Sequence, residues 1–326
     1  MSIVYKTTDE NVNFNDVKNI LEMAFGGRKI DNVDEVKEAF INSQYKIYAF
    51  DDDKLIGFSR AIANSNYAII YNVALNPLYQ GKGIGKDIIN RLVASLEGKE
   101  IYTFTHPRTI SLYEHLGFVR TKMAFKYIKE ADKDRVKNQA GVGFFLPDDY
   151  LFDGEKRNDI NPIINDNIVY KDHFDDNDIE DINKLLNDYY KDNKSIKDTE
   201  KDLKRADFIE LVYENNILIG VAEIITDSVK EALLVNAAVK KDYEGVFYNL
   251  INKITLRANE YDIFIHANLN DYSIYNNSRD FKRYKTAFKY VGNACYNERL
   301  YLPRDYRYDD ELGSEVIRYY KGKILN

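Results

Sequence analysis

The sequence contains an internal repeat, and this repeat determines how many folded copies the chain should hold. Two pairs of segments match at the same offset of 163 residues, LIGFSRA at 55–61 with LIGVAEI at 218–224, and RTKMAFKY at 120–127 with RYKTAFKY at 283–290. A third segment, FFLPDDYLFDGE from Phe144, recurs as LYLPRDYRYDDE from Leu300. The offset of this third match is 156 residues, and the shorter value reflects a longer loop in the first copy. An ordered series of such matches predicts a duplicated fold.

The chain length agrees with two domains of ordinary size. A chain of 326 residues is longer than one small core needs and suits two domains of roughly 150 residues each. The polar stretch from Gly154 to Asn167 is the best candidate linker, which puts the boundary near residue 160. We therefore predict one domain over 1–160 and a second over 161–326.

The first half alternates helical and strand-like patterns. Apolar residues at helical spacing predict helices over 13–25, ending at Gly26 and Gly27, and around 33–40. Strand-like runs separated by short polar turns are expected to pair antiparallel, at 45–50, 55–63 and 67–75, after an extended segment at 3–6. The stripe of Ile88, Ile89, Leu92, Val93 and Leu96 predicts a helix that crosses over to a parallel strand at 101–104. The fold class is α/β of the α+β type, with a mixed, mostly antiparallel sheet flanked by helices in each copy.

A glycine-rich loop, QGKGIG at 80–85, joins the third strand to the crossover helix. Glycines at 81, 83 and 85 allow backbone amides to approach an anion, and the helix adds its positive end. A dinucleotide site is disfavoured because the preceding strand is antiparallel in character and no acidic residue ends the next strand. The pattern also lacks the Lys followed by Ser or Thr of a nucleoside-triphosphate loop. These features predict a different phosphate-containing ligand.

The segments NVALNPLYQGKGIGKDIINRL and SLYEHLGF resemble the GNAT superfamily of N-acetyltransferases. The cofactor loop of that family reads Gln or Arg, two residues, Gly, one residue, then Gly or Ala, and Gln80, Gly83 and Gly85 occupy these places. The resemblance implies two tandem GNAT-like domains and acetyl-CoA as the coenzyme A cofactor. Its pyrophosphate would rest on the amides of Gln80, Gly81, Lys82, Gly83, Ile84 and Gly85, and its pantetheine arm would pair with Val73, Ala74 and Leu75.

The same resemblance implies a catalytic tyrosine. The family residue stands shortly before a Gly-Phe pair, as Tyr113 stands before Gly117 and Phe118, and it would protonate the departing thiolate. With reference pKa values of about 10 for a phenol and about 8.5 for a thiol, full transfer is uphill by roughly 2 kcal/mol. A hydrogen bond to the developing thiolate is sufficient for this role.

The general base is not identified by the sequence. Many relatives place a carboxylate on the strand before the loop, but YAIIYNVAL at 67–75 has none. Water held by backbone carbonyls and a carboxylate from the second half both remain open. His106 and His115 lie near the tyrosine motif, although a lone histidine is more often structural.

The second copy has lost the loop. Its segment YEGVFYN puts Glu244, Phe247 and Asn249 where the first copy has Gln80, Gly83 and Gly85. A carboxylate repels a pyrophosphate, and a phenylalanine blocks close contact with the backbone. We predict that this copy binds no acetyl-CoA there and serves a structural role or shapes the acceptor pocket. Tyr275, the counterpart of Tyr113, is then structural.

The composition disfavours several kinds of site, location and partner. One cysteine, Cys295, excludes an internal disulfide, and four scattered histidines give no metal site. No leader or membrane span is evident, which predicts a cytoplasmic protein. A net charge of -7 disfavours nucleic acid and favours cationic partners. A monomer with pseudo-dimeric halves and a homodimer are both compatible with the repeat.

The predicted function is acetyl transfer from acetyl-CoA to a primary amine, by direct attack in a ternary complex. A small-molecule acceptor is preferred, and a protein lysine or N-terminus is the alternative within this class. The alternative from another class is a non-catalytic acyl-CoA-binding sensor or scaffold. Fold-level analogy does not choose the acceptor.

Overall fold

The computed structural model describes a defined part of the chain, namely residues 2–24, 29–129, 144–147, 150–152, 155, 165, 167–278, 280–292, 297, 299–303, 306 and 308. Gly26, Gly27, Cys295 and most of the predicted linker at 154–167 lie outside the described residues.

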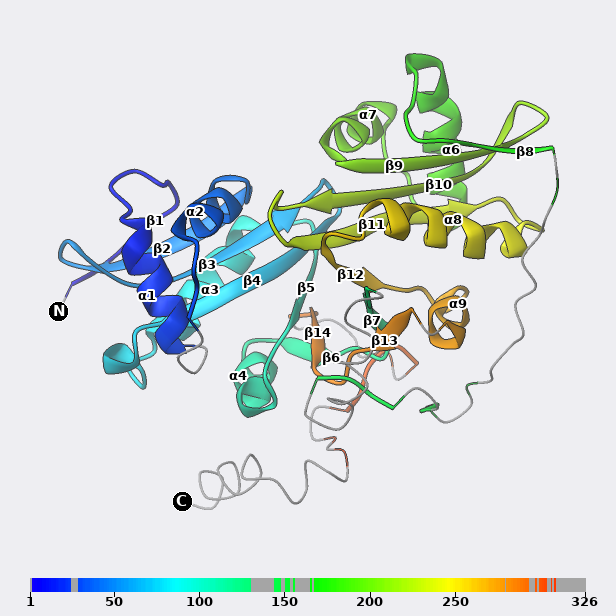
Figure 1. Cartoon of the computed structure of the whole chain (residues 1–326). Helices are drawn as coiled ribbons and strands as arrows, with labels where there is room; N and C mark the ends of the chain where they lie inside the picture. Colours follow the sequence, from blue (N-terminus) through cyan, green and yellow to red (C-terminus); the bar gives the residue numbers. More distant parts are fainter. Residues whose placement is uncertain are drawn as a thin grey trace. The chain divides into compact units, whose positions relative to one another are not determined.

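The N-terminal elements follow the predicted order (Figure 1). Four strands pair antiparallel in sequence order: β1 (Ile3–Lys6), β2 (Tyr45–Asp51), β3 (Lys54–Ala63) and β4 (Tyr67–Leu75). The helices are α1 (Phe14–Ala24), α2 (Val33–Ile41) and α3 (Ile84–Ser95). Asn32 caps α2 by accepting a hydrogen bond from the Asp34 N–H at 2.9 Å, as expected for an Asn at a helix N-terminus.

The second half repeats this arrangement, which confirms the duplicated fold. Its strands are β8 (Ile168–Lys171), β9 (Phe208–Glu214), β10 (Ile217–Thr226), β11 (Glu231–Val239) and β12 (Asp262–His266). Its helices are α6 (Ile179–Tyr190), α7 (Ile196–Arg205) and α8 (Glu244–Arg257). β8 to β11 pair antiparallel, whereas β11 and β12 are parallel, so α8 is a crossover helix and the sheet is mixed.

A glycine at equivalent positions of the two copies allows each crossover helix to pack closely on its sheet. A Cβ on Gly57 would lie 3.0 Å from Cδ1 of Ile88 in α3 and 2.9 Å from the Ala74 carbonyl oxygen. Its counterpart Gly220 would meet Leu250 of α8 at 3.4 Å. On the opposite face of β3, Phe58 belongs to a buried cluster with residues of α1 and α2. Each LIG motif therefore sets the helix-to-sheet distance.

The chain divides into two compact units that differ from the two halves of the sequence. The first unit is Met1–Ile101 with Asn158–Ile265, and the second is Tyr102–Arg157 with His266–Asn326. Each unit takes segments from both copies of the repeat. The functional division between 1–160 and 161–326 stays a prediction.

The second unit contains an exchange of strands between the copies. Its elements are β5 (Glu100–Phe104, which starts in the first unit), α4 (Ile110–His115), β6 (Phe118–Arg120), β7 (Ala124–Tyr127), α9 (Tyr272–Asn277), β13 (Phe281–Arg283) and β14 (Ala287–Tyr290). β14 from the second half pairs antiparallel with β5 and β6 of the first. β7 from the first half pairs with β13 of the second. The copies therefore swap strands.

The segments after the exchanged strands cluster together within this unit. Leu146 and Phe152 of the first copy pack with Leu302 and Tyr308 of the second in one buried cluster. The buried Arg283 forms a bidentate ion pair with Glu155, at 2.8 and 3.2 Å. Paired segments of the repeat thus contact each other directly, while 148–149 and 304–305 lie outside the described residues.

Candidate functional site

The predicted cofactor loop lies between β4 and α3, after a short helical turn at Pro77–Tyr79. Gly81 has φ 76° and Gly83 has φ 84°, in the left-handed region that favours glycine. A Cβ added at either position, or at Gly85, would meet no atom within 4 Å. These glycines are therefore not required by packing within the unit; they give the loop its backbone shape and leave open space beside it.

The Gln80 N–H donates to the Pro77 carbonyl at 3.2 Å, whereas the backbone amides at the start of α3 are available to a ligand. The first N–H that enters the α3 ladder is that of Asp87, which donates to the Gly83 carbonyl at 3.1 Å. Ile84, Gly85 and Lys86 precede it, so their N–H groups have no helical partner. Gln80, Gly81, Lys82 and Gly83 are exposed, whereas the Ile84 side chain is buried and anchors the helix start. The loop presents the positive end of α3 to solvent, which suits an anionic group.

The predicted pantetheine strand contains a β-bulge. In the register of β3 with β4, Phe58 faces Ala74 but Arg60 faces Tyr71, so β4 holds one extra residue. Asn72 takes up the distortion with φ 52°, and its Oδ1 accepts a hydrogen bond from Arg60 Nε at 2.6 Å. The bulge redirects the backbone immediately before Val73, Ala74 and Leu75.

Tyr113 belongs to the second compact unit, whereas the glycine-rich loop belongs to the first. It lies on α4 with 4% of its surface exposed, against Phe118 and stacked on Phe288 of the exchanged β14 at 5.8 Å. Its hydroxyl shares side-chain hydrogen bonds with Thr103 and Thr105 of the β5 region. Both copies of the repeat thus surround the predicted catalytic residue.

Burial changes what Tyr113 can do. It raises the pKa of the phenol to about 12, against the opposing effect of the two threonine hydrogen bonds. Relative to a thiol with a pKa of about 8.5, full proton transfer is then uphill by roughly 5 kcal/mol, compared with about 2 kcal/mol for an unperturbed phenol. A neutral, oriented hydrogen-bond donor is the role that this environment supports.

The histidines near Tyr113 are engaged locally. His106 Nδ1 accepts from the Arg108 N–H at 3.2 Å and caps a short turn, and burial lowers the pKa of its imidazole. His115 Nδ1 lies 2.6 Å from the Ser111 carbonyl oxygen in the same helix. Both histidine side chains therefore contact backbone groups of their own segment.

The equivalent positions of the second half form a continuous helix. α8 begins at Glu244, so Phe247, Tyr248 and Asn249 lie within helical turns instead of a loop. Phe247 is 1% exposed and stacks on Tyr189 with ring centroids 6.4 Å apart. Tyr275 is also buried, between Phe125 and Phe281. The backbone at these positions is helical, and that this copy binds no acetyl-CoA there stays a prediction.

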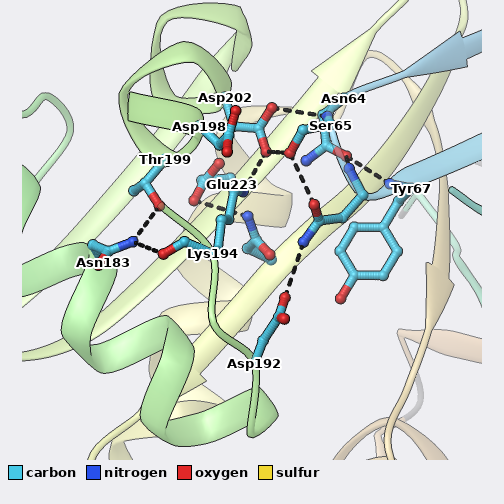
Figure 2. Close-up of polar contacts among 12 residues, drawn as sticks. Asn64, Ser65, Tyr67, Asn183, Asp192, Lys194, Asp198, Thr199, Asp202 and Glu223 are labelled. Atoms are coloured by element: carbon cyan, nitrogen blue, oxygen red, sulfur yellow. Dashed lines mark hydrogen bonds and ion pairs between the residues drawn. The ribbon is translucent and has the colours of Figure 1, made fainter. Parts of the chain in front are cut away.

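A buried polar cluster joins the β3–β4 turn to the second half, and sequence reasoning did not locate it (Figure 2). Asp202 of α7 accepts hydrogen bonds from the Ser65 N–H at 2.8 Å and the Ser65 hydroxyl at 2.5 Å, and it pairs with Lys194. Nearby, Glu223 of β10 accepts from Asn236 Nδ2 at 3.0 Å and is fully buried. The repeat carried one signal: Glu223 occupies the position of Arg60, so opposite charges stand on equivalent buried strands.

Comparison with known proteins identifies the family. The family model described as "Acetyltransferase (GNAT) domain" matches residues 43–120, which hold the bulged strand, the loop and Tyr113. Over 125 residues the chain is 30% identical to "Uncharacterized N-acetyltransferase ycf52" of Pyropia yezoensis, covering 36% of this chain and 71% of that relative. The chain belongs to the GNAT family of N-acetyltransferases.

Solved structures show that the GNAT likeness of the fold extends over both halves. A putative acetyltransferase from Pyrococcus horikoshii aligns with a TM-score of 0.50 and 15% identity, over 90% of each chain. A GCN5-related N-acetyltransferase from Sphaerobacter thermophilus aligns with a TM-score of 0.52 and 9% identity, over 88% of this chain and 94% of that one. At these identities the likeness concerns the fold alone.

The described residues of the GNAT chain also lack two other features. No helix there combines the length and apolar character that crossing a bilayer requires. No group of three or more His, Cys, Asp or Glu side chains in those same ranges is placed to hold a metal ion.

Proposed function

We propose that this GNAT enzyme transfers the acetyl group of acetyl-CoA to a primary amine of a small molecule, by direct attack in a ternary complex. The observation that carries the proposal is the loop at 80–85, where two left-handed glycines expose amides at the start of α3. The loop suits a pyrophosphate because it offers backbone N–H groups and a helix N-terminus, which bind phosphate oxygens. Acetyl-CoA supplies the activated acetyl thioester.

The chain's own residues divide the work of the proposed reaction. Amides of residues 81–85 would hold the pyrophosphate beside Gln80, whose own N–H donates to the Pro77 carbonyl, and the backbone of 73–75 after the bulge would pair with the pantetheine arm. Tyr113 would donate a hydrogen bond to the sulfur as negative charge develops there. The net charge of -7 favours capture of a cationic amine, which supports an amine acceptor without choosing its identity.

Turnover of an amine panel tests the proposal. Polyamines, amino sugars and arylalkylamines are supplied with acetyl-CoA, and released CoA is followed with a thiol reagent; the single cysteine, Cys295, adds at most one background thiol per chain. Tyr113→Phe should lower kcat on the order of 100-fold and leave acetyl-CoA affinity unchanged. Tight acetyl-CoA binding without turnover of any amine would instead favour the sensor or scaffold, and turnover of a lysine peptide alone would favour a protein acceptor.

A further inference from the structure

The proposed reaction needs a group that removes a proton from the acceptor. An alkylammonium with a pKa near 10.4 is neutral in only about one molecule in 2500 at pH 7. Strand β4 carries no Asp or Glu from Tyr67 to Leu75. A carboxylate base must therefore come from another element.

A chain of contacts inside the first unit connects the β4 bulge to the start of β11. Arg60 Nε donates to Asn72 Oδ1 at 2.6 Å, and Arg60 Nη2 forms an ion pair with Asp227 Oδ2 at 2.8 Å. The other oxygen of Asp227 accepts the backbone N–H of Glu231 at 2.9 Å. Arg60 and Asp227 are both buried, so these contacts are shielded from solvent. The backbone of Glu231 is thereby tied to the bulged residue through two side chains.

A second contact links the same two strands. The Tyr71 hydroxyl lies 3.4 Å from the Ala232 carbonyl oxygen, and the Arg60 guanidinium stacks 5.5 Å from the centre of the Tyr71 ring. Tyr71 directly precedes Asn72, and Ala232 directly follows Glu231. Two independent contacts thus bring the start of β11 beside the bulge of β4.

The carboxylate of Glu231 differs from the other buried acids of the first unit. No hydrogen bond or ion pair to it is found among the described residues, and the residue keeps partial solvent exposure. Glu223, in contrast, is fully buried; its Oε1 accepts from Asn236, and its Oε2 has no hydrogen-bond partner among the described residues. Lys230, the neighbour of Glu231, lies 3.7 Å from Asp262. A proton acceptor is therefore left uncommitted.

The surroundings of Glu231 suit proton transfer at neutral pH. Burial raises the pKa of its carboxyl to about 7, and four charged groups act on it in smaller, opposing ways. Lys230 and Arg60 lower the pKa, whereas Asp262 and Asp227 raise it. Compared with a carboxylate at 4.5, a base with a pKa of 7 accepts a proton from the same ammonium roughly 300-fold more favourably.

We propose that Glu231, contributed by the second half, is the general base for the acceptor amine of the first half. This inference rests on the proposed acetyl transfer. The ammonium gives one proton to the carboxylate of Glu231, and the neutral amine then forms a C–N bond with the acetyl carbon as the C–S bond breaks. The second amine proton accompanies the leaving thiolate to give free CoA, and Glu231 returns its proton to solvent.

The test compares Glu231→Gln with Glu223→Gln in the full chain, using two acceptor probes. Phenethylamine is charged at neutral pH and needs a base, whereas methoxyamine is already neutral. We expect Glu231→Gln to lower kcat/KM on the order of 100-fold for phenethylamine and less than about threefold for methoxyamine. The rising limb of the pH profile near 7 should vanish for phenethylamine. Glu223→Gln should change neither probe.

Other outcomes overturn the inference or separate it from the proposed function. Equal losses for both probes would show a structural role, and an unchanged pH profile in Glu231→Gln would exclude a base. If the wild type acetylates neither probe, the proposed function fails for these amines. A carbon-13 NMR titration of Glu231, assigned with Glu231→Gln, then decides the inference: a pKa near 4.5 overturns it, and one near 7 supports it.

Discussion

Replacing Glu223 by glutamine should remove a loss of folding stability that the wild type shows as the pH rises. Burial raises the pKa of the Glu223 carboxyl to about 7, with Lys194 and the Asn236 hydrogen bond lowering it and Asp202 raising it. A raised pKa means that the folded state binds the proton more tightly than the unfolded state. The stabilisation is complete below pH 4.5 and is lost as the pH rises to 7. The full shift corresponds to ~3 kcal/mol, of which ~2 kcal/mol falls between pH 5 and pH 8.5.

Urea unfolding of the wild type and Glu223→Gln at pH 5 and pH 8.5 measures this difference. Glutamine keeps the acceptor for Asn236 Nδ2 and has no charge to desolvate, so the variant should gain ~2 kcal/mol relative to the wild type between the two pH values. Titrations of all other groups, including Glu231, cancel in the comparison. A difference in unfolding free energy that stays constant with pH, or that favours the variant at pH 5, would refute the reasoning.

Two further substitutions test other parts of the structure. Ser65→Ala removes a donor at 2.5 Å from the buried Asp202, so it should lower the free energy of unfolding by about 1 to 3 kcal/mol; a value near zero in urea titration would mean that water replaces the hydroxyl. Phe288→Ala and its repeat counterpart Phe125→Ala should each lower the free energy of unfolding by about 3 to 5 kcal/mol because both rings are fully buried. Only Phe288→Ala should also lower kcat, since Phe288 stacks on Tyr113 and Phe125 packs on Tyr275; equal losses of kcat would contradict this assignment.

Local patterns were sufficient to predict most of the elements. The sequence shows strand-like runs at 45–50, 55–63 and 67–75, which short turn sequences separate. The observed strands differ from these ranges by at most one residue at each end. The loop was predictable because the left-handed positions at Gly81 and Gly83 favour glycine. Such features depend on residues that are adjacent in the sequence, so short stretches of sequence are enough to predict them.

The strand exchange was not predictable from local pattern, for a specific reason. β7 and β14 have the same sequence, AFKY, so each fits either sheet equally well. The choice between them depends on how the segments before and after these strands pack. Likewise, the pattern of β10 and β11 shows that Glu223 and Glu231 lie on strands, but their raised pKa values depend on burial by segments that are distant in the sequence. Tertiary context of this kind is not encoded in spacing.

Calorimetric titration of acetyl-CoA tests the central claim, that the loop of the first copy holds the cofactor. The wild type is compared with Gly83→Phe, which installs the residue of the second copy, and with Gly98→Phe as a matched control. Gly98 also has a positive φ of 82° and open space around its Cβ position, but it lies in the turn after α3, away from the loop. We predict one site in the wild type and in Gly98→Phe, and none in Gly83→Phe. Two sites in the wild type, or undiminished binding to Gly83→Phe, would contradict the account.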